Sequence, residues 1–86
     1  MEFEFDAAKS QSNKKKHGID FYEAQALWDD PEHIEIPART VDETRFLIIG
    51  QIAQRCWSGI FTCRHGKIRI ISVRRARNKE VEIYES

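Results

Sequence analysis

The chain has 86 residues, 41% of them hydrophobic, and 14 basic residues balance 14 acidic ones. This length predicts one domain, residues 1–86, whose modest core buries about 60% of the surface of the unfolded chain. No stretch reaches the roughly 18 consecutive apolar residues of a membrane span, and the acidic start Met1–Glu4 does not resemble an export signal, so we expect a cytoplasmic protein with no membrane contact.

The first part of the sequence predicts a short strand and a helix. Residues 2–5 alternate charged with aromatic side chains, which is typical of an edge strand. Asp6 is placed to cap a helix over residues 7–17, and Gly18 is placed to end it. Because this helix carries few apolar residues, we expect most of it to be exposed.

A second helix begins at a capping-box pattern, Asp20 followed by Glu23, and ends at Asp30-Pro31. Its apolar residues recur at helical spacing and predict one stripe that faces the core: Phe21, Ala24, Leu27 and Trp28.

The second half predicts strands and a terminal helix. Residues 33–39 favour a short strand, and residues 40–43 a loop. Longer strands are predicted at residues 45–52, 56–64 and 67–75, and a short helix at residues 78–84. The fold class is therefore α+β, with the N-terminal strand and two helices packed on one face of a mainly antiparallel sheet, followed by a short C-terminal helix.

The neutral total charge hides a segregation along the chain. Up to Glu43 there are 11 acidic and 5 basic residues, whereas residues 44–79 hold 9 basic residues and no acidic one. Such a segment attracts polyanions, either nucleic acid or an acidic protein. The alternative is a plain solvated face.

Two turns set the predicted register of this cationic segment. A two-residue turn at His65-Gly66 places Arg64 opposite Lys67, Thr62 opposite Arg69, Ile60 opposite Ile71 and Ser58 opposite Val73. A four-residue turn at residues 53–56 places Ile52 opposite Trp57, and Arg45 opposite Arg64.

In this register one sheet face is apolar and the other cationic. The core face holds Phe46, Ile48, Ile52, Trp57, Phe61, Cys63, Ile68 and Ile70. The opposite face holds a row of three cations, Arg45, Arg64 and Lys67, with Arg69 and Arg75 beside it, while Arg74 falls on the core-facing side. Because like charges repel, the row needs a counter-charge, in part Glu43 and otherwise phosphate. A register slip of one residue would reverse these faces, and in the plainer alternative the arginine stems only cover Leu47, Ile49 and Ile71.

Other reactive residues carry weaker signals. Cys56 and Cys63 are seven residues apart without a Cys-x-x-Cys spacing, so we expect free thiols, buried or half-buried, and neither a metal site nor a cofactor. His65 is interpreted as a turn residue, and His33 as exposed or at an interface.

Several motifs together resemble one family. They include Phe3-x-Phe5-Asp6, the block Lys16-His17-Gly18-x-x-Phe21-x-x-Ala24, and the block Arg69-Ile70-Ile71-Ser72-x-Arg74-Arg75-Ala76. In this order and in a chain of this length, they closely resemble the BrnT toxin family over nearly the whole sequence. The departures are Phe5 where the family often has tryptophan, Trp28 where it has phenylalanine, and Arg77 in place of a threonine helix cap.

The resemblance implies a RelE-like fold, metal-independent RNA cleavage that inhibits translation and growth, and a type II toxin–antitoxin system. It also implies neutralisation by a BrnA-like antitoxin, a ribbon-helix-helix protein that binds DNA, in a toxin–antitoxin hetero-oligomer. DNA contact is then expected only through the antitoxin. The alternative is a noncatalytic partner-binding module that acts as co-repressor.

Metal-independent cleavage requires proton removal from a 2′-hydroxyl and stabilisation of charge on the phosphate. For these tasks we select Arg45 and Arg64 as phosphate clamps, Arg69 or Arg74 as assistants, and Glu43 as the base or the group that orients an arginine. The candidate RNA-binding residues are Lys16, His17, Lys67, Arg75 and Tyr84. The alternatives are that His17 satisfies the last helix carbonyls, that Tyr84 packs in the core, and that Lys14–Lys16 are a solvated face.

Overall fold

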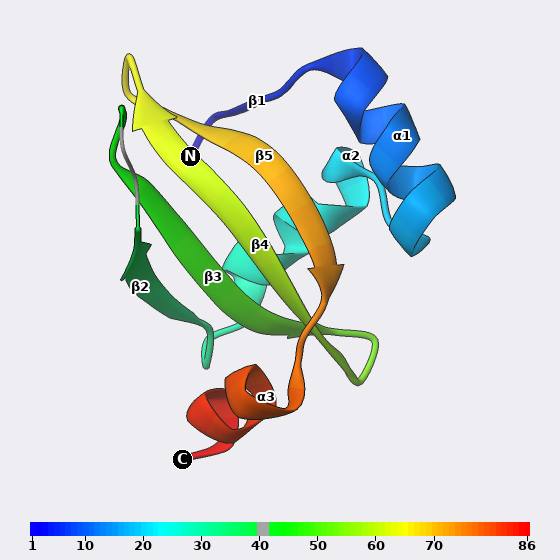
Figure 1. Cartoon of the computed structure of the whole chain (residues 1–86), viewed down its shortest axis with the longest axis vertical. Helices are drawn as coiled ribbons and strands as arrows, with labels where there is room; N and C mark the ends of the chain where they lie inside the picture. The colour runs from blue at the N-terminus through cyan, green and yellow to red at the C-terminus, as the bar shows by residue number, and fades with distance from the viewer. Residues whose placement is uncertain (40–41) are drawn as a thin grey trace.

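The computed structural model describes residues 1–39 and 42–86, which form an α+β fold around a five-stranded sheet (Figure 1). Of the predicted loop at residues 40–43, Thr40 and Val41 lie outside the described residues. In chain order the elements are β1 (Phe3–Glu4), α1 (Ala7–His17), α2 (Phe21–Ala24), the 3-10 helix η1 (Gln25–Asp29), β2 (Ile34–Ala38), β3 (Arg45–Ile52), β4 (Arg55–Arg64), β5 (Lys67–Arg75) and α3 (Asn78–Glu85).

The strand order is β1-β5-β4-β3-β2, and every neighbouring pair is antiparallel except β1 and β5. α1, α2 and η1 pack on one face of the sheet, as predicted, while α3 lies against β3 on the other. Figure 1 shows α3 below the end of β5, with β1 beside the first half of that strand. None of the helices within residues 1–39 and 42–86 is both long and apolar enough to cross a membrane.

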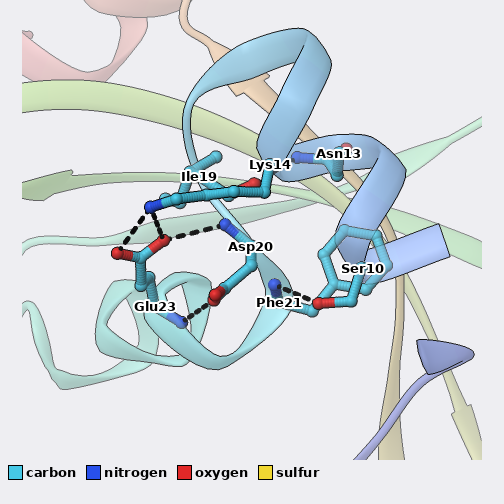
Figure 2. A network of polar contacts seen from close by, with 7 residues as sticks. All are labelled: Ser10, Asn13, Lys14, Ile19, Asp20, Phe21 and Glu23. Atoms are coloured by element: carbon cyan, nitrogen blue, oxygen red, sulfur yellow. Dashed lines mark hydrogen bonds and ion pairs between the residues drawn. The ribbon is translucent and has the colours of Figure 1, made fainter. Parts of the chain in front are cut away.

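The helix starts follow the predicted caps. The Asp6 side chain accepts a hydrogen bond from the Lys9 N–H, and Gly18 ends α1 in a left-handed conformation with φ 82°. Asp20 and Glu23 form the predicted capping box, drawn in Figure 2. The second helix differs from the prediction because it is one α-helical turn, α2, that tightens into η1; its apolar stripe still faces the core.

Buried polar groups, rather than an apolar stripe, hold α1 against the rest of the protein. The hydroxyl of Ser10 accepts a hydrogen bond from the Phe21 N–H at 2.9 Å (Figure 2). The amide of Asn13 donates one to the Ile19 carbonyl at 2.8 Å. Both side chains are buried. The rest of α1 is largely exposed, as its composition predicted.

The β4–β5 hairpin confirms part of the predicted register. His65 and Gly66 form a two-residue turn with φ 52° and 75°, and Arg64 pairs with Lys67 and Thr62 with Arg69. Beyond Phe61 the prediction is wrong, since a β-bulge leaves Ile71 without a counterpart and pairs Ile60 with Ser72. The physical reason is burial: the bulge turns Val73 rather than Ser72 into the core, where Val73 is 1% exposed.

The predicted β3–β4 turn is also wrong. The turn consists of Ala53 and Gln54, both left-handed, so Ile52 pairs with Arg55 instead of Trp57. This register sets large residues against glycines, because Trp57 pairs with Gly50 and Ile48 with Gly59. The shift is two residues, so each side chain stays on its predicted face.

The core lies between the sheet and the N-terminal helices. Its most buried members are Ile19, Phe21, Ala24, Leu27, Ile48, Phe61, Ile70 and Val73. Trp28 packs against them, as predicted. Ile49, on the other face, is also fully buried, on the strand against which α3 lies.

Candidate functional site

Four cationic side chains lie toward the β4–β5 turn on the sheet face opposite α1, α2 and η1, which we call the outer face. Phe46 and Phe61 face the core, so their neighbours Arg45 and Thr62 point to the outer face, and Arg64 does likewise. Arg69 pairs with Thr62, and Lys67 with Arg64. We call Arg45, Arg64, Lys67 and Arg69 the outer cationic patch; all are exposed except Arg69, which is half-buried.

The predicted straight row of three cations is wrong in one detail. Because Phe46 pairs with Phe61, Arg45 comes beside Thr62, and Arg64 lies two residues further along β4, toward the β4–β5 turn. Arg45 and Arg64 are therefore diagonal neighbours on one face rather than directly opposed. This spacing reduces their mutual repulsion relative to direct opposition.

The counter-charge on the patch comes from β1 and from Glu2, the residue before it. Glu2 lies 3.9 Å from the Lys67 ammonium, and Glu4 lies 3.7 Å from the Arg69 guanidinium. The parallel pairing of β1 with β5 sets Glu4 beside Arg69. Within residues 1–39 and 42–86, Arg45 and Arg64 have no carboxylate within 4.0 Å, and the predicted partner Glu43 forms no ion pair.

The bulge at Ile71 exchanges the predicted positions of Arg74 and Arg75. Arg74, predicted on the core-facing side, pairs with Ser58 and points to the outer face. Arg75, predicted on the cationic face, instead lies over the Trp57 ring, 5.5 Å from its centroid. Both predictions fail for the same reason, since one extra residue in β5 reverses every side chain that follows it.

Arg74 is fully engaged within the fold. Its guanidinium donates two hydrogen bonds of 2.8 Å to the two carboxylate oxygens of Glu80. Glu80 also accepts from the Ser58 hydroxyl and from the Arg77 N–H, each at 2.8 Å. The Arg74 hydrogen bonds, with those from Arg77 and Ser58, lower the pKa of Glu80 to about 2. The Arg74–Glu80 pair joins β5 to α3. It therefore holds the start of α3, where Arg77 stands in place of a threonine cap.

Glu43 lies at a depression next to the outer cationic patch. A surface hollow of about 520 Å³ is lined by Glu43, Thr44, Phe46, Thr62, Cys63 and Arg64. Arg64 and Glu43 therefore line the same hollow. Cys63 lies here and is exposed, so the expectation of a buried or half-buried thiol is wrong for Cys63, while Cys56 is half-buried.

Three predicted RNA-binding residues lie at the other end of the sheet. Lys16 and His17 close α1, and the next residue, Gly18, lines a second hollow of about 410 Å³ together with Trp57, the residue under Arg75. Lys67 and Arg75 begin and end β5, so about 26 Å separates them at the usual rise per residue. The structure therefore divides the predicted site residues into two groups.

Tyr84 is held by a carboxylate. Its hydroxyl donates a 2.7 Å hydrogen bond to Asp30, which also accepts from the Gln51 N–H at 2.8 Å. The hydrogen bond to Asp30, together with burial, raises the pKa of Tyr84 to about 12. Tyr84 thus joins α3 to the end of η1 and to β3.

Sequence reasoning missed the polar partners that hold these elements together: Glu2, Glu4, Asn13, Asp30 and Glu80. For Glu80 a signal existed, because a glutamate three residues after a helix cap commonly accepts from the cap N–H. Each of the other four has a partner that is distant in sequence, and no local pattern shows that partner. His65 is a turn residue as interpreted, and His33 is half-buried and hydrogen-bonded to Glu35.

Comparison with known protein families gives a match over most of the chain. Residues 5–80 fit the model of a family described as the ribonuclease toxin BrnT of type II toxin–antitoxin systems. No curated protein sequence shows significant similarity to the chain.

Proposed function

The chain belongs to the BrnT family of ribonuclease toxins of type II toxin–antitoxin systems, and on this premise we propose that it is a RelE-like endoribonuclease that cleaves RNA without a metal ion. In this proposal residues 1–86 act as one toxin domain in the cytoplasm, where cleavage inhibits translation and growth. The observation that carries it is the outer cationic patch. Arg45 and Arg64 are exposed on one face with no ion-pair partner in the part of the chain that the structure describes.

The patch suits a phosphate that gains charge during the reaction. Arginine forks donate paired hydrogen bonds to phosphate oxygens and stay charged at every working pH. In the proposed step the 2′-oxygen attacks phosphorus as the bond to the 5′-oxygen breaks, which leaves a 2′,3′-cyclic phosphate and a 5′-hydroxyl. Arg45 and Arg64 hold the phosphate oxygens, and Arg69 assists from the adjoining strand.

Glu43 is the carboxylate that lines the hollow beside Arg64. We assign to it the removal of the 2′-hydroxyl proton or the orientation of Arg64, and the 5′-oxygen takes its proton from water. Arg74 is proposed no longer as an assistant but as a structural group, since Glu80 occupies its guanidinium. Lys67 binds the neighbouring phosphate, whereas Lys16, His17 and Arg75 contact RNA only further along the strand.

As a type II toxin, the chain has a protein antitoxin as partner. We propose that this antitoxin is a BrnA-like ribbon-helix-helix protein, that the two form a hetero-oligomer, and that DNA is bound only through the antitoxin.

The test incubates purified protein with end-labelled single-stranded RNA in excess EDTA. Cleavage products with a 5′-hydroxyl are expected from the wild type, and their loss from Arg64→Ala, with unchanged circular dichroism. Arg55→Ala is the matched control, because Arg55 is an exposed arginine at the far end of β4. RNA binding without cleavage by the wild type would instead favour the noncatalytic co-repressor, and cleavage that EDTA abolishes would refute metal independence.

A further inference from the structure

The hollow beside Arg64 lies where β4 extends beyond its last residue paired with β3. The last β3–β4 pair is Phe46 with Phe61, whereas β4 stays paired with β5 as far as Arg64. The overhanging residues of β4, Thr62, Cys63 and Arg64, therefore form one wall of the hollow, and Glu43 and Thr44 form another. Residues of both sheet faces meet here, at the open end of the sheet.

One residue that lines the hollow, Phe46, has a ring with aromatic neighbours. Phe46 is half-buried and stacks on Phe61, with 5.4 Å between ring centroids and 26° between ring planes. Phe61 is 2% exposed and contacts Trp28 edge to face, and Trp28 contacts Phe3 in the same way. This series of rings runs from β1 through the core to the hollow, so it holds the Phe46 ring in place.

The lining also holds a hydroxyl that already has an acceptor, a thiol and two charged groups. The Thr62 hydroxyl donates a 2.6 Å hydrogen bond to the Thr44 carbonyl, which uses the proton of that hydroxyl. Cys63 presents a thiol, which is a weak donor. Two charged residues also line the hollow: Glu43, which carries a carboxylate, and Arg64, which carries a guanidinium. A ligand therefore finds an apolar aromatic surface, an anion and a cation at one hollow.

We propose that this hollow binds the nucleobase of the nucleotide on the 5′ side of the cleaved phosphate, stacked on Phe46. The inference rests on the proposed function and adds the recognition of the substrate base. A nucleotide presents a flat aromatic base, a ribose with its 2′-hydroxyl, and a phosphate, and these three parts match Phe46, Glu43 and Arg64 in kind. An acidic peptide fits less well, because its carboxylates match only Arg64 and it offers no flat base to stack on Phe46.

The strength of stacking on a phenylalanine depends on the area of the base and not on the hydrogen-bonding groups at its edge. Purines present a larger surface than pyrimidines, so the site prefers adenine and guanine over cytosine and uracil, with little distinction between the two purines. In other proteins that bind single-stranded nucleic acids, alanine substitution of a stacking residue reduces binding by about fivefold to a hundredfold per base. We expect the preference for a purine over an abasic residue at this position to fall in the same range.

The experiment uses the full chain and a set of RNA oligonucleotides that differ at one position, 5′ to the cleaved phosphate: a purine, a pyrimidine or an abasic residue. The wild type is expected to cleave the purine oligonucleotide at least about fivefold faster than the abasic one. Phe46→Leu, which keeps an apolar contact with Phe61, should lose most of this difference. The matched control is Phe5→Leu, since Phe5 is a half-buried phenylalanine that packs on Phe21 and Tyr22 instead.

A second measurement keeps base binding separate from cleavage. An oligonucleotide with 2-aminopurine at the same position should lose fluorescence on binding to the wild type and to Phe5→Leu, but not to Phe46→Leu. If no RNA is cleaved but this quenching occurs, the proposed function fails while the base site stands. Equal cleavage of purine and abasic oligonucleotides by the wild type, or unchanged quenching in Phe46→Leu, would overturn the base site alone.

Discussion

The side chain of Asn13 pairs with both backbone groups of Val73, a residue 60 positions further along the chain. Its amide nitrogen donates to the Val73 carbonyl at 2.9 Å, and its amide oxygen accepts from the Val73 N–H at 3.2 Å. β1 pairs only with Ile68 and Arg69 at this edge of β5. Asn13 thus provides the Val73 backbone with the two hydrogen bonds that a longer edge strand would provide, and it joins α1 to the sheet.

Asn13→Ala is expected to lower the free energy of unfolding by about 2–4 kcal/mol, because it leaves the buried Ile19 and Val73 carbonyls without donors. Asn13→Asp should be equally damaging, since a carboxylate cannot donate to them. Urea denaturation measures both, with the exposed Ser12→Ala on the same helix as control. A loss below about 1 kcal/mol in Asn13→Ala would contradict this role.

Glu80 makes stability depend on pH in the acid range. Its pKa is about 2 in the folded protein, against an ordinary value of 4.5, so its contribution is complete above about pH 4.5 and is lost as pH falls toward 2. The shift corresponds to about 3 kcal/mol. Glu80→Gln should therefore be less stable than the wild type at pH 7 and should approach it near pH 2. Glu82→Gln, an exposed change on the same helix, should keep the wild-type pH profile in thermal unfolding.

Glu2 and Glu4 compete with phosphate for Lys67 and Arg69. The double variant Glu2→Gln/Glu4→Gln is expected to bind single-stranded RNA about two- to tenfold more tightly at low salt. Its affinity should also fall more steeply with salt concentration, because two more cations are free to displace counterions. Fluorescence anisotropy at several salt concentrations tests this, with the exposed pair Glu32→Gln/Glu82→Gln as the control of equal charge change. Unchanged affinity in the double variant would show that β1 does not compete.

Arg45 and Arg64 should act as one unit. If both hold the same phosphate, Arg45→Ala and Arg64→Ala each reduce kcat by about a hundredfold or more, while the double variant loses less than the product of the two effects. Single-turnover cleavage rates complete this double-mutant cycle. Strictly multiplicative effects would place the two guanidinium groups on different phosphates.

Tyr84→Phe separates a structural tyrosine from an RNA-stacking one. The variant keeps the ring and loses the hydrogen bond to Asp30, so it should lower stability by about 1.5–3 kcal/mol, as expected for a bond to a charged group. Its cleavage rate should be unchanged at a temperature where it remains folded. A large loss of cleavage without a loss of stability would instead assign the hydroxyl to the reaction.

Local patterns in the sequence predicted most of the elements and the turn at the tip of the β4–β5 hairpin. Asp6 and Asp20 cap helices as expected, and His65 and Gly66 supply the left-handed turn. These features depend on residues a few positions apart, so their physics is contained in the local sequence. The alternation in β3 and β4 likewise predicted that Arg45 and Arg64 share the outer face, and a register error of two residues does not disturb that.

Only the tertiary structure decided the pairing of the strands and the partners of the charged groups. The bulge at Ile71 depends on the gain from burying Val73 against Gly59, and the β3–β4 turn on setting Trp57 against Gly50. Asn13, Asp30 and Glu80 find their partners across the fold. The energy of such contacts depends on how distant segments fill space together, which no local pattern contains, whereas caps, turns and alternating faces are determined by neighbouring residues alone.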